Sequence, residues 1–149
     1  LLMKRLDPSH DITVIERNRA DDTFGWGVVF SDETLGHFEE ADPGSYGQII
    51  DHFINWQDID TYYRDECVRS TGHGFCGMSR KKLLNILQDR CSELGVTLLF
   101  ETEVSDLKEF ADADLILAAD GVNSVIREQY AAHFKPTISR ESRARSPDL

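Results

Sequence analysis

Basic residues, long apolar runs and regularly spaced cysteines are all scarce in this sequence. Its 16 lysines and arginines face 27 aspartates and glutamates, which gives a net charge of −11. A chain this acidic is a poor partner for nucleic acids and for anionic membranes. No apolar stretch approaches the roughly 18 residues that span a bilayer, and no signal-peptide pattern is visible. We therefore expect a cytoplasmic protein that binds neither nucleic acid nor membrane.

The three cysteines, Cys67, Cys76 and Cys91, lack the paired spacing of a zinc site. His73 and Cys76 could form half of one, but no second half is found. An odd number of cysteines in a cytosolic protein also argues against disulfides. No nucleophile–base pair of side chains is evident in the sequence. We predict no metal site, and we assign no catalytic side chain.

Composition divides the chain into two parts. The chain is 40% hydrophobic and 29% charged, which is typical of a globular domain. Residues 139–149 contain three arginines and no apolar periodicity, so we expect a disordered or foreign tail there. The folded domain is expected to end at residue 138.

The most informative stretch is the apolar run of residues 115–119, which ends on Asp120 and Gly121. The pattern predicts a buried strand that opens directly into a helix from Asn123 to about His133. A carboxylate at the end of a strand, a glycine and a new helix N-terminus together suit a nucleotide ribose or pyrophosphate. The alternative is an ordinary turn between a strand and its crossover helix.

A second predicted strand, residues 11–15, ends on Glu16. In dinucleotide-binding folds the acid at this place accepts hydrogen bonds from the ribose hydroxyls, and a Gly-rich loop lies about 20 residues before it. Residues 1–6 are typical of the end of the helix that follows those glycines. We therefore expect the first strand and the Gly-rich loop to be missing from this sequence.

Glycines interrupt the aromatic and β-branched run of residues 24–30, which predicts either backbone close to a ligand or an exposed hairpin. Helical patterns follow over residues 31–54, with a cap at Ser31 or Asp32 and a break at Pro43. Strand patterns cover residues 56–63, 66–71 and 96–100. Between the last two, a helix capped by Ser79 is predicted over residues 79–94.

Arg80 occupies the first turn of this helix, where a cation opposes the helix dipole. Bound phosphate or ribose oxygens would explain an arginine at such a position. The alternative is a surface arginine without a ligand.

Four motifs in this order resemble the flavoprotein aromatic monooxygenases of the para-hydroxybenzoate hydroxylase superfamily, closest to its salicylyl-CoA 5-hydroxylase-like branch. The resemblance covers residues 1–138. Its motifs are Val-Ile-Glu-Arg-Asn at 14–18, Phe-Gly-Trp-Gly-Val-Val-Phe at 24–30, Cys-Gly-Met-Ser-Arg-Lys-Lys-Leu-Leu at 76–84, and Ala-Asp-Gly-Val-Asn-Ser at 119–124.

This resemblance implies a partial FAD-binding domain over residues 1–138. The fold expected is α/β and Rossmann-like, with strands 11–15, 97–101 and 114–119 in one mainly parallel sheet. It also implies FAD reduced by NAD(P)H, and transfer of one oxygen atom to a small aromatic substrate, with an aryl-CoA as one candidate. The fragment itself is expected to be inactive. The implied cofactor contacts are Glu16, Arg17, Trp26, Gly27, Arg80, Val104, Asp120 and Gly121.

Two other functions stay open at this point. One is an NAD(P)-dependent oxidoreductase domain on a similar fold, against which the Trp26–Val28 segment and the Arg80 helix count. The other is a non-catalytic remnant of the fold that serves as an interaction module. The oligomeric state is left open.

Overall fold

The computed structural model describes residues 1–135, apart from the side chain of Asp32, as two units that meet at residues 103 and 104. The first unit has four helices: α1 (Leu2–Leu6), α2 (Asp32–Ala41), α3 (Pro43–Ile50) and α4 (Arg80–Glu93). Its strands are β1 (Thr13–Ile15), β2 (Gly27–Ser31), β3 (Ile54–Trp56), β4 (Ile59–Tyr63), β5 (Glu66–Ser70), β6 (Phe75–Ser79) and β7 (Thr97–Leu99). The second unit has a 3₁₀ helix (Leu107–Phe110), α5 (Val125–Gln129) and α6 (Ala131–Phe134).

The strands form three small sheets. β1 and β7 pair in parallel, with Thr13 opposite Thr97 and Ile15 opposite Leu99. β2, β6 and β3 form an antiparallel sheet with β6 in the centre, and β4 and β5 form an antiparallel hairpin. The α/β class and the parallel pairing of the first predicted strand with residues 97–99 are confirmed. The prediction of one mainly parallel sheet is wrong, because most of the described strands pair antiparallel.

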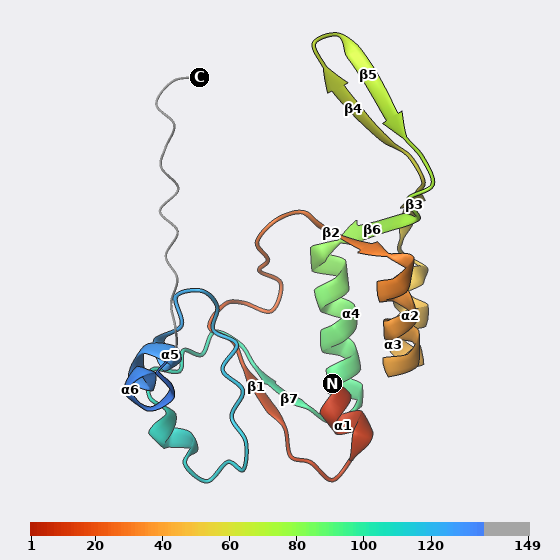
Figure 1. Cartoon of the computed structure of the whole chain (residues 1–149). Coiled ribbons are helices and arrows are strands. Elements are labelled where there is room, and N and C mark those ends of the chain that lie inside the picture. The colour runs from red at the N-terminus through yellow and green to blue at the C-terminus, as the bar shows by residue number, and fades with distance from the viewer. Residues whose placement is uncertain (136–149) are drawn as a thin grey trace, which may run out of the picture. The chain divides into compact units, whose positions relative to one another are not determined.

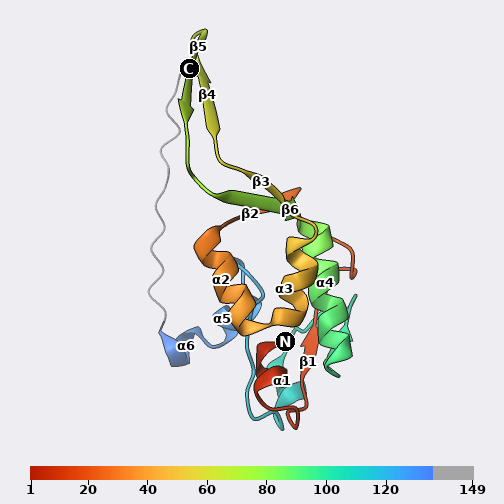
Figure 2. The ribbon, with the colours of Figure 1, turned by 90° about the vertical axis from the view of Figure 1, so that its right-hand side faces the viewer.

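The hydrophobic core lies between the β2–β6–β3 sheet and helices α2, α3 and α4, which lie on one side of it (Figures 1 and 2). Phe30 of β2 packs edge-on against Phe38 of α2, with 5.6 Å between ring centroids. Val28 and Phe30 of β2 and Met78 of β6 pack in this core, whereas Val29 between the first two is exposed, as expected for a strand with one covered face. The buried centre of the core consists of Ile49, Met78, Leu83 and Ile86.

Local sequence signals set the helix ends. The side chain of Ser31 accepts a hydrogen bond from the Thr34 amide at 3.4 Å, so its predicted capping role is confirmed. Pro43 begins α3, as the predicted break requires, because proline suits the first helical position. Ser79 takes the N-cap position of α4 but its side chain makes no capping bond, so that part of the prediction is wrong.

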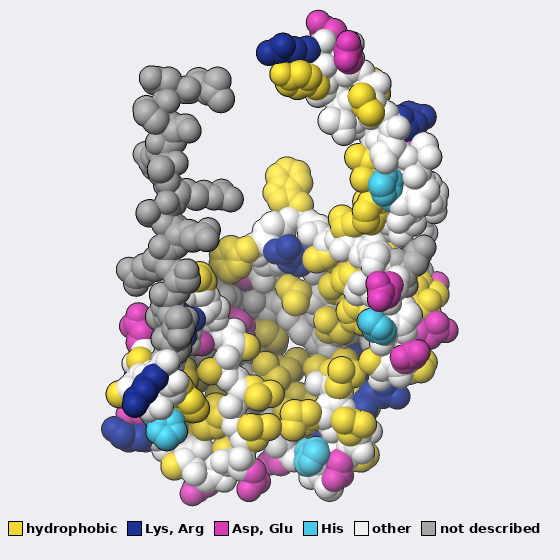
Figure 3. Space-filling model, in the orientation of Figure 1, with side chains coloured by type: hydrophobic (Ala, Val, Ile, Leu, Met, Phe, Trp, Pro, Cys, Tyr) yellow, Lys and Arg dark blue, Asp and Glu magenta, His cyan; other side chains and the backbone are white. Residues whose placement is uncertain are grey.

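The β4–β5 hairpin extends away from this core, and every residue of both strands is exposed. Its two-residue turn places Arg64 and Asp65 at φ of 46° and 65°, the left-handed geometry that matches the twist of a hairpin. Figure 3 shows hydrophobic side chains along it. Tyr62 of β4 is 76% exposed. A two-stranded hairpin without a covering layer is marginally stable by itself.

The second unit departs most from prediction. Residues 115–119 form no strand and are all exposed, although their sequence is continuously apolar. A strand needs a neighbour to take its backbone hydrogen bonds, and none of the described strands pairs with this run. The helix expected from Asn123 to His133 is instead two short helices that meet at Tyr130.

No helix in the described part of the chain is long and apolar enough to cross a membrane. Residues 139–149, predicted as a separate tail, lie outside the residues that the structure describes.

Candidate functional site

Glu16 follows β1 directly and is half-buried. Its amide donates to the carbonyl of Leu99 at 2.8 Å, which continues the parallel ladder and fixes the backbone at this point. One carboxylate oxygen, Oε1, accepts from the Asn18 amide at 2.8 Å and from Asn18 Nδ2 at 2.7 Å. No described residue donates to Oε2. Glu16 therefore offers an oriented carboxylate with one oxygen available, and the neighbouring Arg17 is exposed.

Arg80 reaches back from the first turn of α4 to the loop Phe24–Gly27. Its Nη1 donates to the carbonyl of Phe24, and its Nη2 lies 3.5 Å from the carbonyl of Gly27. The Arg80 amide donates to the Trp26 carbonyl at 3.2 Å. The carbonyl oxygens of Phe24 and Gly27 accept hydrogen bonds from the Arg80 guanidinium, and they stabilise its positive charge at a place where the helix dipole opposes that charge. A bound anion is therefore not needed to explain why an arginine stands here.

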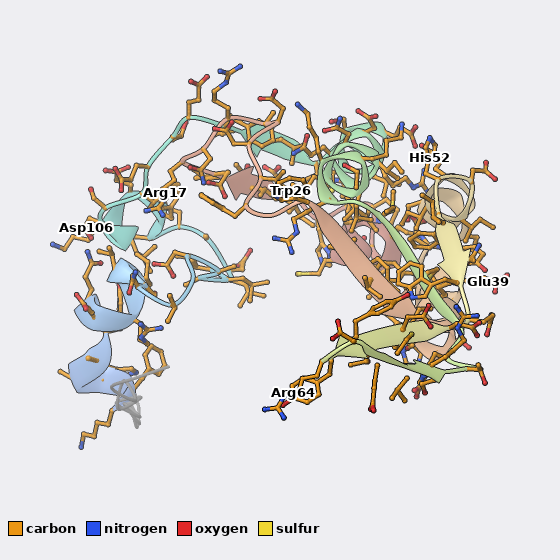
Figure 4. The ribbon with its side chains drawn as sticks, turned by 90° about the horizontal axis from the view of Figure 1, so that it is seen from above. Arg17, Trp26, Glu39, His52, Arg64 and Asp106 are labelled. Carbon is orange, nitrogen blue, oxygen red and sulfur yellow. The ribbon has the colours of Figure 1, made fainter. Side chains whose placement is uncertain are left out.

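Trp26 lies in this loop, directly before β2 begins (Figure 4). Its side chain is 97% exposed. Gly25, just before it, has φ +84°, and a Cβ on Gly25 would lie 3.2 Å from Arg80 Nη1. A glycine is required here both for the left-handed backbone and for the close approach of the guanidinium. The loop thus carries an uncovered indole ring, and the backbone of the loop contacts Arg80.

The structure brings together Arg80, Trp26 and Gly27. Within the described residues, no hydrogen bond or ion pair joins Glu16 or Arg17 to Arg80. The remaining predicted contacts, Val104, Asp120 and Gly121, belong to the second unit. The predicted convergence of Glu16, Arg80 and Asp120 on one sheet edge therefore stays a prediction.

In the second unit, Asp120 and Gly121 shape the turn that enters α5. Asp120 Oδ2 accepts from the Ile126 amide at 3.2 Å, and a hydrogen bond from the Ser124 side chain lowers the pKa of the Asp120 carboxyl. Gly121 has φ +87°, which only glycine adopts without strain. Both residues line an open cleft of about 780 Å³. Val104, at the start of the unit, is half-buried.

Asp42 is a buried charged residue that the sequence did not single out. Its side chain is 3% exposed and receives Arg90 Nε at 3.0 Å and Arg5 Nε at 3.2 Å. Asp42 also caps α3 by accepting from the Ser45 amide at 3.2 Å. Burial raises the pKa of this carboxyl, but hydrogen bonds from Arg90 and Ser45 outweigh burial and hold the pKa below its ordinary value. An aspartate directly before Pro43 is a pattern that could have indicated the capping role of Asp42. No local pattern in the sequence indicates that Arg90 and Arg5 are its partners.

A nucleophile–base contact also appears that the sequence did not indicate. Ser70 Oγ, at the end of β5, lies 2.7 Å from Nε2 of His73, which stands in the connection between β5 and β6. The His73 ring stacks on Phe75 with 5.4 Å between centroids. No acidic side chain among the described residues orients this imidazole, so the pair lacks the third member of a triad. Within residues 1–135, no group of three His, Cys, Asp or Glu could hold a metal ion.

The fold resembles part of the fold of two larger proteins of known structure. A solved variant of 2-methyl-3-hydroxypyridine-5-carboxylic acid oxygenase superposes with a TM-score of 0.66 over 79% of this chain and 35% of that chain, at 24% identity. A solved variant of PqsL from P. aeruginosa superposes with a TM-score of 0.70 over 95% of this chain and 43% of that chain, at 18% identity. Identities this low establish the shared fold alone.

Curated relatives carry the assignment further. The chain is 43% identical over 136 residues to salicyloyl-CoA 5-hydroxylase of a Streptomyces species, covering 91% of this chain and 26% of that protein. It is 32% identical to 3-hydroxy-4-methyl-anthranilyl-[aryl-carrier protein] 5-monooxygenase of Streptosporangium sibiricum, covering 85% of this chain and 35% of that protein. No protein-family model matches the chain.

The chain thus spans about a quarter to a third of the curated relatives that it matches. A third relative, protodeoxyviolaceinate monooxygenase of Chromobacterium violaceum, is 31% identical over 91% of this chain. The resemblance inferred from the four motifs is confirmed: the chain is related by sequence to the flavin-dependent aromatic monooxygenases.

Proposed function

We propose that this chain forms part of the FAD site of an aromatic monooxygenase. The single observation that carries the proposal is the contact between Arg80 and the loop that holds Trp26 and Gly27. These residues come from motifs far apart in the sequence, and the fold places them together. Two segments that serve one ligand are expected to meet in this way.

The donors and acceptors present fit FAD. Oε2 of Glu16 is free to accept from a ribose hydroxyl, because Asn18 uses only Oε1. The exposed indole of Trp26 offers a flat apolar surface to an isoalloxazine ring. Arg17 and Gly27 lie next to these two groups in the sequence. Val104, Asp120 and Gly121 are proposed as further contacts from the second unit.

When bound, FAD would supply the redox chemistry, with NAD(P)H as the source of electrons and oxygen as the oxidant. The chain's own residues bind and orient the cofactor. The proposed substrate is a small aromatic molecule, and an aryl-CoA thioester is favoured by the relation to salicyloyl-CoA 5-hydroxylase. A cytoplasmic location without nucleic-acid or membrane partners is part of the same proposal.

Titration of FAD against the 149-residue chain, followed by flavin fluorescence, tests this function. Glu16→Gln keeps an oxygen for Asn18 but replaces the free oxygen with an amide. We expect it to weaken FAD binding by about 1.5–3 kcal/mol, the value of a hydrogen bond to a charged group. Glu39→Gln on the exposed face of α2 is the matched control and should leave the affinity unchanged.

Other results would favour the other functions. Saturable binding of NADH or NADPH without any binding of FAD would indicate a nicotinamide-dependent oxidoreductase. A cooperative melt without binding of either nucleotide would indicate a non-catalytic module. Equal FAD affinity of the Glu16→Gln variant and the parent would remove Glu16 from the site.

A further inference from the structure

The Trp26 ring makes little contact with the protein and does not help to hold the loop Phe24–Gly27 in place. Because this side chain is 97% exposed, it buries almost no surface that could hold the loop in place. Glycines stand on both sides of it, and glycine loses more conformational freedom on ordering than any other residue. Such a loop binds a ligand weakly unless another group orders it beforehand.

Arg80 supplies that order from outside the loop. Three carbonyls in four consecutive residues face Arg80: its amide bonds Trp26, Nη1 bonds Phe24 and Nη2 approaches Gly27. The guanidinium also fills the space beside Gly25 where a Cβ would otherwise stand. Arg80 itself is half-buried on a helix of 14 residues that packs in the core, so its backbone is held firmly.

We propose that Arg80 is a positioning residue, which holds the backbone of the Phe24–Gly27 loop through these hydrogen bonds (the clasp) and thereby fixes the Trp26 ring for a planar ligand. The proposal rests on the proposed function only in taking that ligand to be the flavin. Arg80 would then act on the cofactor through the loop, in addition to any direct contact.

The geometry of the clasp distinguishes arginine from lysine. A guanidinium is a planar fork whose two terminal nitrogens can donate to two carbonyls at once, whereas a lysine ammonium is a single point of charge. Arg80→Lys therefore keeps the charge and removes the fork. If Arg80 served only as a charge for the ligand, this variant would leave the ligand-free loop unchanged.

The first measurement is made without any ligand, on the full 149-residue chain. Backbone ¹⁵N relaxation gives amide order parameters for Phe24, Gly25 and Trp26, which precede β2. We expect values near the roughly 0.85 of rigid backbone in the parent, and below about 0.6 in Arg80→Lys. Lys82→Ala, which removes an exposed cation two residues further along α4, is the control and should keep the parent values. Parent-like order parameters in Arg80→Lys would overturn the clasp.

A second pair of variants tests the same contact from the loop side. Gly25→Ala puts a methyl group 3.2 Å from Nη1 and strains a left-handed backbone, so it should loosen the loop as Arg80→Lys does. Gly36→Ala lies on α2 where a Cβ would meet nothing within 4 Å, and it should change nothing in the loop. If Arg80→Lys fails to fold, this pair still decides the question, and an ordered loop in Gly25→Ala would refute the proposal.

FAD affinity then connects the clasp to function. Loss of pre-ordering should raise the dissociation constant of FAD about tenfold in both Arg80→Lys and Gly25→Ala, with no change in the two controls. A disordered loop with unchanged affinity would overturn the link between the clasp and the ligand. If the parent chain binds no FAD, the proposed function fails for this chain, whereas the order parameters still decide whether Arg80 holds the loop.

Discussion

Two apolar stretches of similar length, residues 75–79 and 115–119, have opposite fates. The first contains a glycine and a serine, yet it forms the central strand β6, and three of its residues are buried. The second, Leu-Ile-Leu-Ala-Ala, is more apolar, yet it forms no strand and is exposed throughout. The difference lies in their neighbours. β6 pairs with β2 on one side and with β3 on the other, whereas residues 115–119 pair with none of the described strands.

Hydrophobicity therefore selects residues that can be buried, but pairing and packing decide whether they are. β6 gains backbone hydrogen bonds on both edges and contact with α4 on one face. Pairing and burial support each other, because a backbone group that is not hydrogen-bonded is costly to bury. The burial of side chains reflects this, because the buried residues among residues 1–135 all lie in the first unit except Ser124.

The largest effect that separates the two regions is expected from truncation of core side chains. Ile49→Ala removes a fully buried side chain from the core of the first unit, and it should lower the free energy of unfolding by about 2–5 kcal/mol. Leu117→Ala removes a leucine that is 72% exposed, and its effect should stay within about 0.5 kcal/mol. Urea denaturation followed by circular dichroism measures both. Similar losses in the two variants would show that residues 115–119 are packed in solution.

A smaller loss is expected at the buried carboxylate of the same unit. Asp42→Asn removes the carboxylate that pairs with Arg5 and leaves Arg90 with Glu93 alone. It should lower stability by about 2–3 kcal/mol, less than for a fully buried pair because both arginines are partly exposed.

The pH dependence of this loss has a definite sign. The pKa of Asp42 is lower in the folded chain than in the unfolded chain. Its contribution is therefore fully present above the unfolded value of about 3.9, and it disappears as the pH falls through the folded value. Unfolding curves at pH 7 and at decreasing acid pH should show the parent converging on Asp42→Asn. A gap that widens in acid would contradict the assignment.

The smallest effect distinguishes two serines that precede helices. Ser31→Ala removes a side-chain acceptor from the start of α2 and should cost about 0.5–1 kcal/mol. Ser79→Ala occupies the same position before α4, where the serine makes no capping bond, and it should cost less than a few tenths of a kcal/mol. Thermal unfolding of the two variants side by side provides the measurement. Equal losses would mean that Ser79 also caps its helix in solution.

Local features of the fold could be predicted from the sequence, as could the parallel pairing of β1 with β7. Most other features that depend on distant partners could not. The break at Pro43, the cap at Ser31 and the strand that ends before Glu16 each follow from neighbouring residues, and all three are found. The exposure of Leu117 could not be predicted, because the pattern of an apolar run does not include its partners.

The same division applies to the candidate site. The motifs selected Arg80 and Trp26 separately, but the bonds between Arg80 and the loop carbonyls depend on how β2 meets the start of α4. The Asp42–Arg90 ion pair likewise joins the start of α3 to the end of α4. The identity of a side chain predicts that its charge needs a partner, but only the packed structure shows which residue is that partner.

The parallel pair β1–β7 is expected to form late in folding. It joins Thr13 to Thr97, so the two strands are separated by 84 positions (from 13 to 97), whereas the β4–β5 hairpin closes across two residues. Loop-closure entropy opposes the distant pair far more than the near one, and such contacts form slowly. The hydrophobic core, which is formed by residues between Thr13 and Thr97 in the sequence, can assemble first. Glu16, whose backbone amide donates to the Leu99 carbonyl at the end of this ladder, is then expected to be among the last residues of the first unit to reach its place. Any ligand that depends on Glu16 binds only to a chain that has finished folding.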